Sequence, residues 1–132
     1  MKPRNLIATL FLLLLVFGYF LKKRWHEPAP REALDRHPEK IYYTRHARCR
    51  MDCRHISEAD IRSILERGVV NLGKSDRRDR PCPTLAVQGE TGAGESIRVI
   101  LAQCPDETRI ITCYNLRREY ECDCPGDENK KH

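Results

Sequence analysis

The chain has 132 residues, seven cysteines and a formal net charge of +5 at pH 7. The basic excess lies near the start: residues 1–40 hold 8 Lys/Arg and 4 Asp/Glu, whereas residues 41–125 hold 14 and 13. A folded part so close to neutral lacks the basic footprint of a nucleic-acid-binding domain, and this argues against nucleic acid as a partner.

Residues Leu6 to Leu21 form an uncharged apolar run that follows the basic start of the chain. As a helix this run spans roughly 24 Å, and the basic residues after it can snorkel to reach the surface of a core about 30 Å thick. A cleaved signal peptide is the alternative, but no small-x-small cleavage site follows the run. We therefore predict a single-pass membrane anchor over residues 1–21, with the membrane as a partner.

Two features predict opposite orientations of this anchor. More Lys and Arg residues follow the apolar run than precede it, and the positive-inside rule then places the main domain in the cytoplasm. Seven cysteines in so small a domain instead favour an oxidising compartment. We give the cysteines more weight and predict a main domain outside the cytoplasm.

Residues 22–39 are rich in proline and in charges of alternating sign, which predicts a linker. His26 and His37 in it are expected to be solvated. About 90 residues follow, enough for one small domain, which we place at residues 40–125, with a disordered tail at 126–132.

The domain is predicted to be α+β, with two short helices packed on a curved antiparallel sheet of about four strands. Thr44 and Ser57 are the expected N-caps of the two helices, and Gly68 ends the second. The expected elements are a strand at 40–44, helices at 45–53 and 58–67, a strand at 69–72, a mobile charged loop at 73–83, hairpin strands at 84–89 and 96–103, and a last strand at 108–114.

The first helix gathers the chemically distinctive side chains on one flank, because positions three and four apart share a face. These residues are His46, Cys49, Arg50 and Cys53, with Arg54 at the edge. A histidine can act as general acid or base, and arginines bind phosphate oxygens. The structural alternative is that His46 donates to a backbone carbonyl and Arg50 pairs with an acidic side chain.

The pattern His-Ala-x-x-Arg-Met-x-x-Arg-x-Ile-Ser, from His46 to Ser57, resembles the domain of unknown function 4258 family. Residues 99–100 and 111–114 are similar to that family's last two strands, so the resemblance covers residues 40–115. It implies a fold like that of small RelE-type ribonuclease toxins, although fold does not imply function. The chain departs from the family at His55, where glycine is common, and in its anchor and cysteines.

The cysteine spacing suggests a link between the first helix and the tail. Cysteines at i and i+4 of a helix face the same way, so Cys49 and Cys53 can reach Cys122 and Cys124 together. Two disulfides would tie the tail to the helix, whereas four thiolates could instead bind a zinc ion, and free buried thiols are a third alternative. A further alternative makes Cys49 a nucleophile beside His46.

These observations favour a non-enzymatic function: a membrane-anchored structural or interaction module, stapled by cysteines, with no cofactor and an unidentified protein partner. The first alternative is a RelE-like, metal-independent ribonuclease or toxin relic that uses His46, Arg50 and Arg54. The second is a thiol or zinc module. It would be built on Cys49, Cys53, Cys122 and Cys124.

Overall fold

A computed structural model describes residues 2–25 and 34–126. The chain divides into two compact units, Met1–Arg31 and Glu32–His132. His26, residues 26–33 of the predicted linker and the predicted disordered tail except Gly126 lie outside the described residues.

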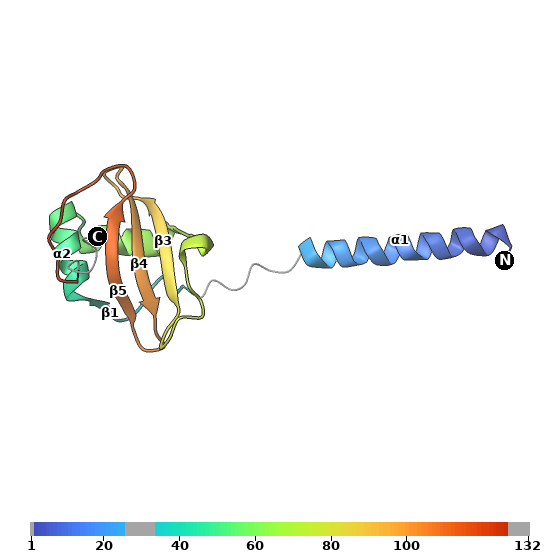
Figure 1. Ribbon diagram of the computed structural model, residues 1–132, viewed down its shortest axis with the longest axis horizontal. Helices are drawn as coiled ribbons and strands as arrows, with labels where there is room; N and C mark the ends of the chain where they lie inside the picture. Colours follow the sequence, from blue (N-terminus) through green and yellow to red (C-terminus); the bar gives the residue numbers. More distant parts are fainter. Residues whose placement is uncertain (1, 26–33, 127–132) are drawn as a thin grey trace. The chain divides into compact units, whose positions relative to one another are not determined.

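The described part of the first unit forms the helix α1, over Pro3–Trp25 (Figure 1). Its segment Asn5–Lys22 has a mean hydropathy of 2.0 and is long and apolar enough to cross a membrane, a test that a signal sequence also passes. Thr9 is a polar residue within this apolar segment, and its hydroxyl donates to the carbonyls of Asn5 (3.0 Å) and Leu6 (2.9 Å). The helix thereby satisfies this hydroxyl internally, as a lipid environment requires.

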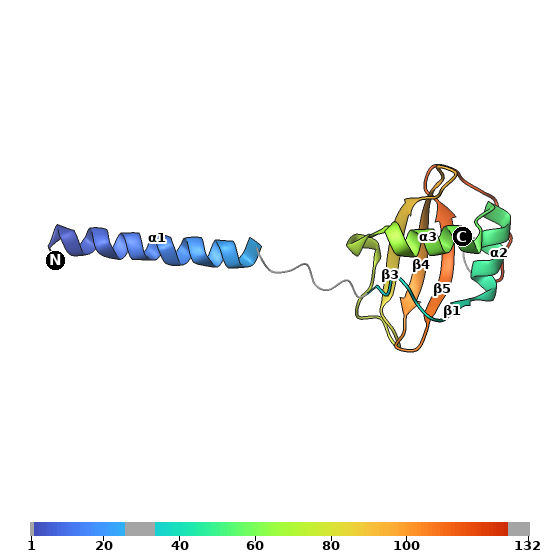
Figure 2. The ribbon, with the colours of Figure 1, turned by 180° about the vertical axis from the view of Figure 1, so that it is seen from behind.

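The second unit confirms the predicted α+β class. Its five-stranded sheet has the order β1-β5-β4-β3-β2, and α3 crosses one face of it (Figure 2). The elements are β1 Ile41–Tyr43, α2 Arg45–Arg54, α3 Glu58–Arg67, β2 Val69–Val70, the 3-10 helix η1 Leu72–Lys74, β3 Thr84–Glu90, β4 Ser96–Gln103 and β5 Thr108–Asn115.

The sheet differs from the prediction in strand number and direction. There are five strands rather than about four, and β1 pairs parallel with β5, with Ile41 opposite Thr108 and Tyr43 opposite Ile110. The remaining pairs are antiparallel. Since the alternation of apolar and polar residues is the same in both pairings, the sequence pattern does not reveal the direction of a three-residue edge strand.

The core lies between α3 and the covered face of the sheet. Ile61, Ile64 and Leu65 project from α3 and are fully buried. They belong to the same core cluster as alternating residues of the central strands, among them Val87, Val99, Leu101 and Ile110. A register shift between Ile100 and Leu101, whose partners are Thr112 and Ile110, leaves one extra residue in β5, and such a bulge bends a strand and increases its twist.

Helix caps fix where α2 and α3 begin and where α2 ends. Thr44 accepts from the backbone N–H of Ala47 at 3.1 Å, and Ser57 forms a capping box with Asp60. His55 ends α2 with φ 55°, in the left-handed region. Glycine adopts this conformation without strain, which accounts for the usual glycine at this position in the family pattern.

Part of the predicted linker is integrated into the domain. Leu34 is buried in the core cluster, and Arg36 donates to the last carbonyls of α3, those of Leu65 (3.2 Å), Glu66 (3.0 Å) and Gly68 (2.9 Å). Such carbonyls have no partner inside the helix. The linker composition hides this role, because a long-range cap leaves no local sequence signal. His37 is exposed, as predicted.

The segment 71–83 carries more structure than the predicted loop. Val69–Val70 is shorter than the predicted strand because Asn71 turns the chain, its side chain accepting from the backbone N–H of Lys74. Asp76 then pairs with Thr84 in an isolated antiparallel bridge. Cys82 is bonded to Cys104, which joins the end of this segment to the end of β4.

Arg36→Ala should lower the free energy of unfolding by about 1 to 2 kcal/mol, because three helix-terminal carbonyls lose a charged donor. Denaturant unfolding of the full chain in detergent micelles, followed by circular dichroism, measures the change. Arg77→Ala removes an exposed loop arginine and is the matched control, for which a change within about 0.5 kcal/mol is expected. Equal effects of the two substitutions would contradict the capping role.

Candidate functional site

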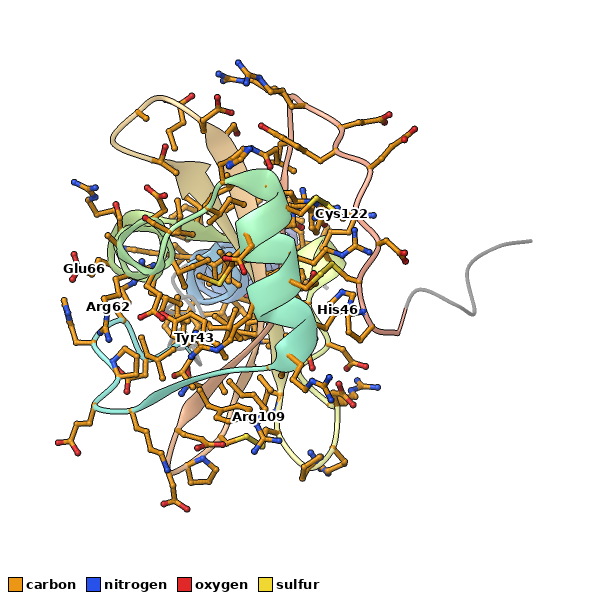
Figure 3. All side chains as sticks on the ribbon, turned by 90° about the vertical axis from the view of Figure 1, so that its left-hand side faces the viewer. Tyr43, His46, Arg62, Glu66, Arg109 and Cys122 are labelled. Carbon is orange, nitrogen blue, oxygen red and sulfur yellow. A yellow bond between two sulfur atoms is a disulfide. The ribbon has the colours of Figure 1, made fainter. Side chains whose placement is uncertain are left out.

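The flank of α2 predicted from its spacing faces the C-terminal tail. The tail follows β5 and returns along α2 without forming a helix or strand of its own up to Gly126. Figure 3 shows His46 and Cys122 on one side of α2 and Tyr43 on the other. The chemically distinctive side of the helix is therefore the side that the tail covers.

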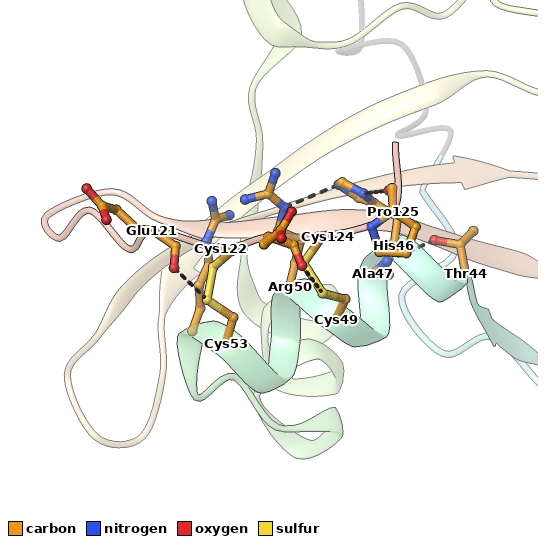
Figure 4. Close-up of a disulfide and its surroundings, with 12 residues drawn as sticks. Thr44, His46, Ala47, Cys49, Arg50, Cys53, Glu121, Cys122, Cys124 and Pro125 are labelled. Carbon is orange, nitrogen blue, oxygen red and sulfur yellow. Dashed lines mark hydrogen bonds between the residues drawn. A yellow bond between two sulfur atoms is a disulfide. The ribbon is translucent and has the colours of Figure 1, made fainter. Parts of the chain in front are cut away.

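Two disulfides hold the tail against α2. Cys49 is bonded to Cys124, and Cys53 is bonded to Cys122, with Cα–Cα distances of 5.8 and 6.0 Å. The two pairs lie one helical turn apart, on the flank that also carries His46 and Arg50 (Figure 4). The tail therefore runs antiparallel to α2, the later cysteine meeting the earlier helix position.

The remaining cysteines complete the count of seven. Cys82 pairs with Cys104, and Cys113 on β5 is an unpaired, buried thiol. Burial raises the pKa of Cys113 to about 11, against the lowering effect of Arg54 and Arg50. This cysteine is therefore protonated at neutral pH and unreactive in the folded domain.

Disulfide formation bears on two of the sequence-based alternatives. Cys49 carries no thiolate while it is bonded to Cys124, so it does not act as a nucleophile in this state. The four sulfurs of the predicted zinc module are likewise paired with one another. In residues 2–25 and 34–126, no group of three or more His, Cys, Asp or Glu is placed to hold a metal ion.

His46 is fixed by contacts at both ring nitrogens. Nδ1 lies 2.7 Å from the carbonyl oxygen of Pro125, which only accepts, so Nδ1 carries the proton. In the neutral ring Nε2 is then an acceptor, and Nε of Arg50 donates to it at 3.4 Å. The imidazole thus links the tail to the guanidinium of Arg50.

Arg54 reaches from α2 to the last strand. Its guanidinium donates to the backbone carbonyl of Cys113 and lies 6.0 Å from the centroid of the Tyr114 ring. Arg98 of β4 lies over the same ring at 5.5 Å and donates to the Tyr114 hydroxyl at 2.9 Å. Two cations therefore hold Tyr114 in place.

The three candidate residues line one pocket of about 620 Å³ between α2, β5 and the tail. The helix supplies His46, Arg50 and Arg54, which the sequence placed on one flank. The strand and the tail supply the other walls. These are Thr112, Tyr114 and Asn115 from β5, and Arg118, Glu119, Tyr120 and Glu121 from the tail.

Charge is unevenly distributed around this pocket. The lining residues supplied by α2 and β5 include two half-buried arginines, Arg50 and Arg54. None of these lining residues is acidic. The acids, Glu119 and Glu121, stand on the tail and are exposed. Figure 4 shows the Glu121 carboxylate directed away from His46 and Arg50. The wall formed by α2 and β5, here called the inner wall, is therefore cationic. The rim formed by the tail carries charges of both signs.

The sequence did not predict that tail residues such as Arg118 and Tyr120 line the site. Arg118 lies 3.6 Å from Glu95, and a hydrogen bond with Tyr120 and then the charge of Glu95 raise the pKa of Arg118. Tyr120 packs edge-on against the His55 ring, with 6.2 Å between the centroids. The paired cysteines at 122 and 124 were the one available signal, since they predict that the residues just before them also lie along α2.

The comparisons with known proteins identify a family and nothing more specific. The family described as Domain of unknown function (DUF4258) matches residues 43–115, more than half of the chain. The predicted family is confirmed by this match. No curated protein and no solved structure matches the chain.

Removal of the two tail disulfides should be strongly non-additive. With one in place, the other closes only the short ring of residues 49–53 and 122–124, so Cys53→Ser/Cys122→Ser should cost about 2 kcal/mol of unfolding free energy. Removal of both pairs also opens the long loop, which adds about 4 kcal/mol and brings the cost to about 6 kcal/mol, more than twice the cost of one pair. Denaturant unfolding measures both variants, with Cys82→Ser/Cys104→Ser as the single-loop control. Strict additivity of the two tail pairs would contradict a shared clamp.

Proposed function

Because the chain belongs to the DUF4258 family, whose description assigns no activity, we propose on physical grounds that it is an interaction module. The module is tethered to a membrane by α1, and its domain lies outside the cytoplasm, where disulfides stabilise it. The observation that carries this proposal is the pair of disulfides between α2 and the tail.

The disulfides support the location. Six of seven cysteines are paired, and paired cysteines persist in oxidising compartments but are rare in the cytosol. The tail has no secondary structure of its own up to Gly126, so the two covalent links hold it in position. A domain that depends on such links is suited to the compartment in which they form.

The tether is supported by α1. The apolar segment Asn5–Lys22 meets the length and composition of a span, and its side chains from Leu6 to Leu21 are exposed in the first unit. Such a long apolar surface has to be covered by lipid or protein.

The ribonuclease is the second candidate, favoured by the convergence of His46, Arg50 and Arg54 on one pocket. The contacts of His46 make the ribonuclease less well supported than the interaction module. A general acid or base needs a ring nitrogen within reach of the substrate proton, whereas Nδ1 faces Pro125 and Nε2 faces Arg50. A positioning role for His46 fits these contacts better than proton transfer.

The location predicts a specific thiol count. Protein extracted from membranes under alkylating conditions should contain three disulfides, with no thiol alkylated in the native state and one, Cys113, after unfolding. Intact mass with and without reductant measures this, and extraction at alkaline pH tests whether the chain is membrane-integral. Seven reduced thiols, or release from the membrane without detergent, would contradict the proposal.

If the chain is an interaction module and not a ribonuclease, the full chain should cleave RNA no faster than its His46→Ala variant. A single-stranded RNA substrate, incubated with each protein in detergent micelles and resolved by electrophoresis, provides the comparison. Cleavage by the wild-type chain that His46→Ala abolishes, without loss of the folded domain by circular dichroism, would establish the enzyme instead.

A further inference from the structure

We propose that the pocket between α2, β5 and the tail binds a small oxyanion, a phosphoryl or carboxylate group carried by a larger ligand. The inference rests on the proposed function, because it names the chemical class that the interaction module recognises. Four features of the pocket carry it: two neighbouring arginines, a wall of α2 and β5 on which no described lining residue is acidic, an oriented guanidinium and the available volume.

Arg50 and Arg54 form the cationic wall. They stand four residues apart on α2, so their side chains leave the same face of the helix, and both are half-buried where they line the pocket. Like charges at this spacing repel each other. An oxyanion that contacts both guanidiniums gains attraction from each, and this attraction is stronger in a partly enclosed space than in bulk water.

The acidic residues of the pocket stand away from this wall. Among the lining residues that α2 and β5 supply, none is acidic, whereas Glu119 and Glu121 belong to the exposed tail. An anion at the inner wall therefore meets guanidinium, imidazole, hydroxyl and amide groups first. The polar side chains there, Thr112 and Asn115, match an oxygen-rich ligand.

His46 gives the wall a fixed geometry. Because Nδ1 donates to Pro125 at 2.7 Å, Nε2 accepts from Nε of Arg50 at 3.4 Å and orients that guanidinium. A guanidinium binds carboxylate and phosphate in a planar fork, so an oriented one loses less freedom on binding. His46 is thus a positioning residue. The tail disulfides hold Pro125 in place, Pro125 orients His46, and His46 orients Arg50.

The volume indicates that the anion is one end of the ligand. About 620 Å³ falls within the range of small-molecule sites and exceeds what a single phosphate or carboxylate fills. Tyr114 and Tyr120 line the remaining space and provide apolar surface with a polar edge. A ligand with an aromatic body and an oxyanion fits both parts of the pocket.

Isothermal titration calorimetry of the full chain in detergent micelles tests this with inorganic phosphate, phenyl phosphate and benzoate. We expect saturable binding of at least one aromatic probe, weakened about tenfold by Arg50→Gln, the effect of losing a charge-assisted hydrogen bond. Binding of phenyl phosphate alone assigns a phosphoryl ligand, binding of benzoate alone assigns a carboxylate, and binding of both assigns the oxyanion as such.

Arg48→Gln is the matched control, because it removes the same charge from the same helix. Arg48 is exposed, lies 3.5 Å from Glu58 and sits over the Tyr43 ring, away from the pocket. The substitution Arg48→Gln should therefore leave the affinity for the probes unchanged. Equal weakening by both substitutions would show a diffuse charge effect and overturn the site, as would the absence of saturable binding by all three probes.

Two further measurements separate the explanations. Arg50→Lys keeps the charge but loses the planar fork, so it should bind more weakly than wild type even if Arg50→Gln fails to fold; undiminished binding would overturn the oriented-fork geometry. The second measurement is the thiol count of the same preparation. If the chain has three disulfides but binds no probe, the oxyanion site is overturned and the proposed location stands.

If its cysteines are reduced, the proposed location is overturned.

Discussion

The covalent clamp between α2 and the tail is the constraint on which the candidate site depends. Residues 116–126 contribute no helix or strand and almost nothing to the hydrophobic core. Without a fixed partner, such a segment keeps its conformational entropy and forms no wall. Two disulfides one helical turn apart fix both its position and its direction, and only then do Pro125 and His46 meet.

The rest of the domain provides a rigid support for this clamp. The antiparallel hairpin β3–β4 and the adjoining β5 hold the buried residues, and α3 packs on them through Ile61, Ile64 and Leu65. The short parallel strand β1 leads directly into α2, so the helix that carries the site starts from the sheet itself. The site therefore joins a packed strand, a capped helix and a covalently held tail.

The sequence predicted those features that local chemistry determines. Thr44 and the Ser57–Asp60 box mark helix starts through side-chain hydrogen bonds within a few residues, and the i, i+4 spacing of Cys49 and Cys53 brought the tail cysteines to one helix face. The arginine cap on α3, the parallel edge strand and the tail wall with Arg118 and Tyr120 were not predictable in this way. Each depends on residues far apart in the sequence, which no short-range pattern reports.

Disulfide mapping of the full chain tests whether the tail is held antiparallel to α2. Cleavage after Arg50 separates Cys49 from Cys53, and cleavage before Asp123 separates Cys122 from Cys124, so each pairing gives a distinct cross-linked peptide. We expect Cys49 to be linked to Cys124 and Cys53 to Cys122, the antiparallel arrangement that brings Pro125 to His46. The opposite pairing, or unlinked peptides, would place the tail differently and contradict the site built on it.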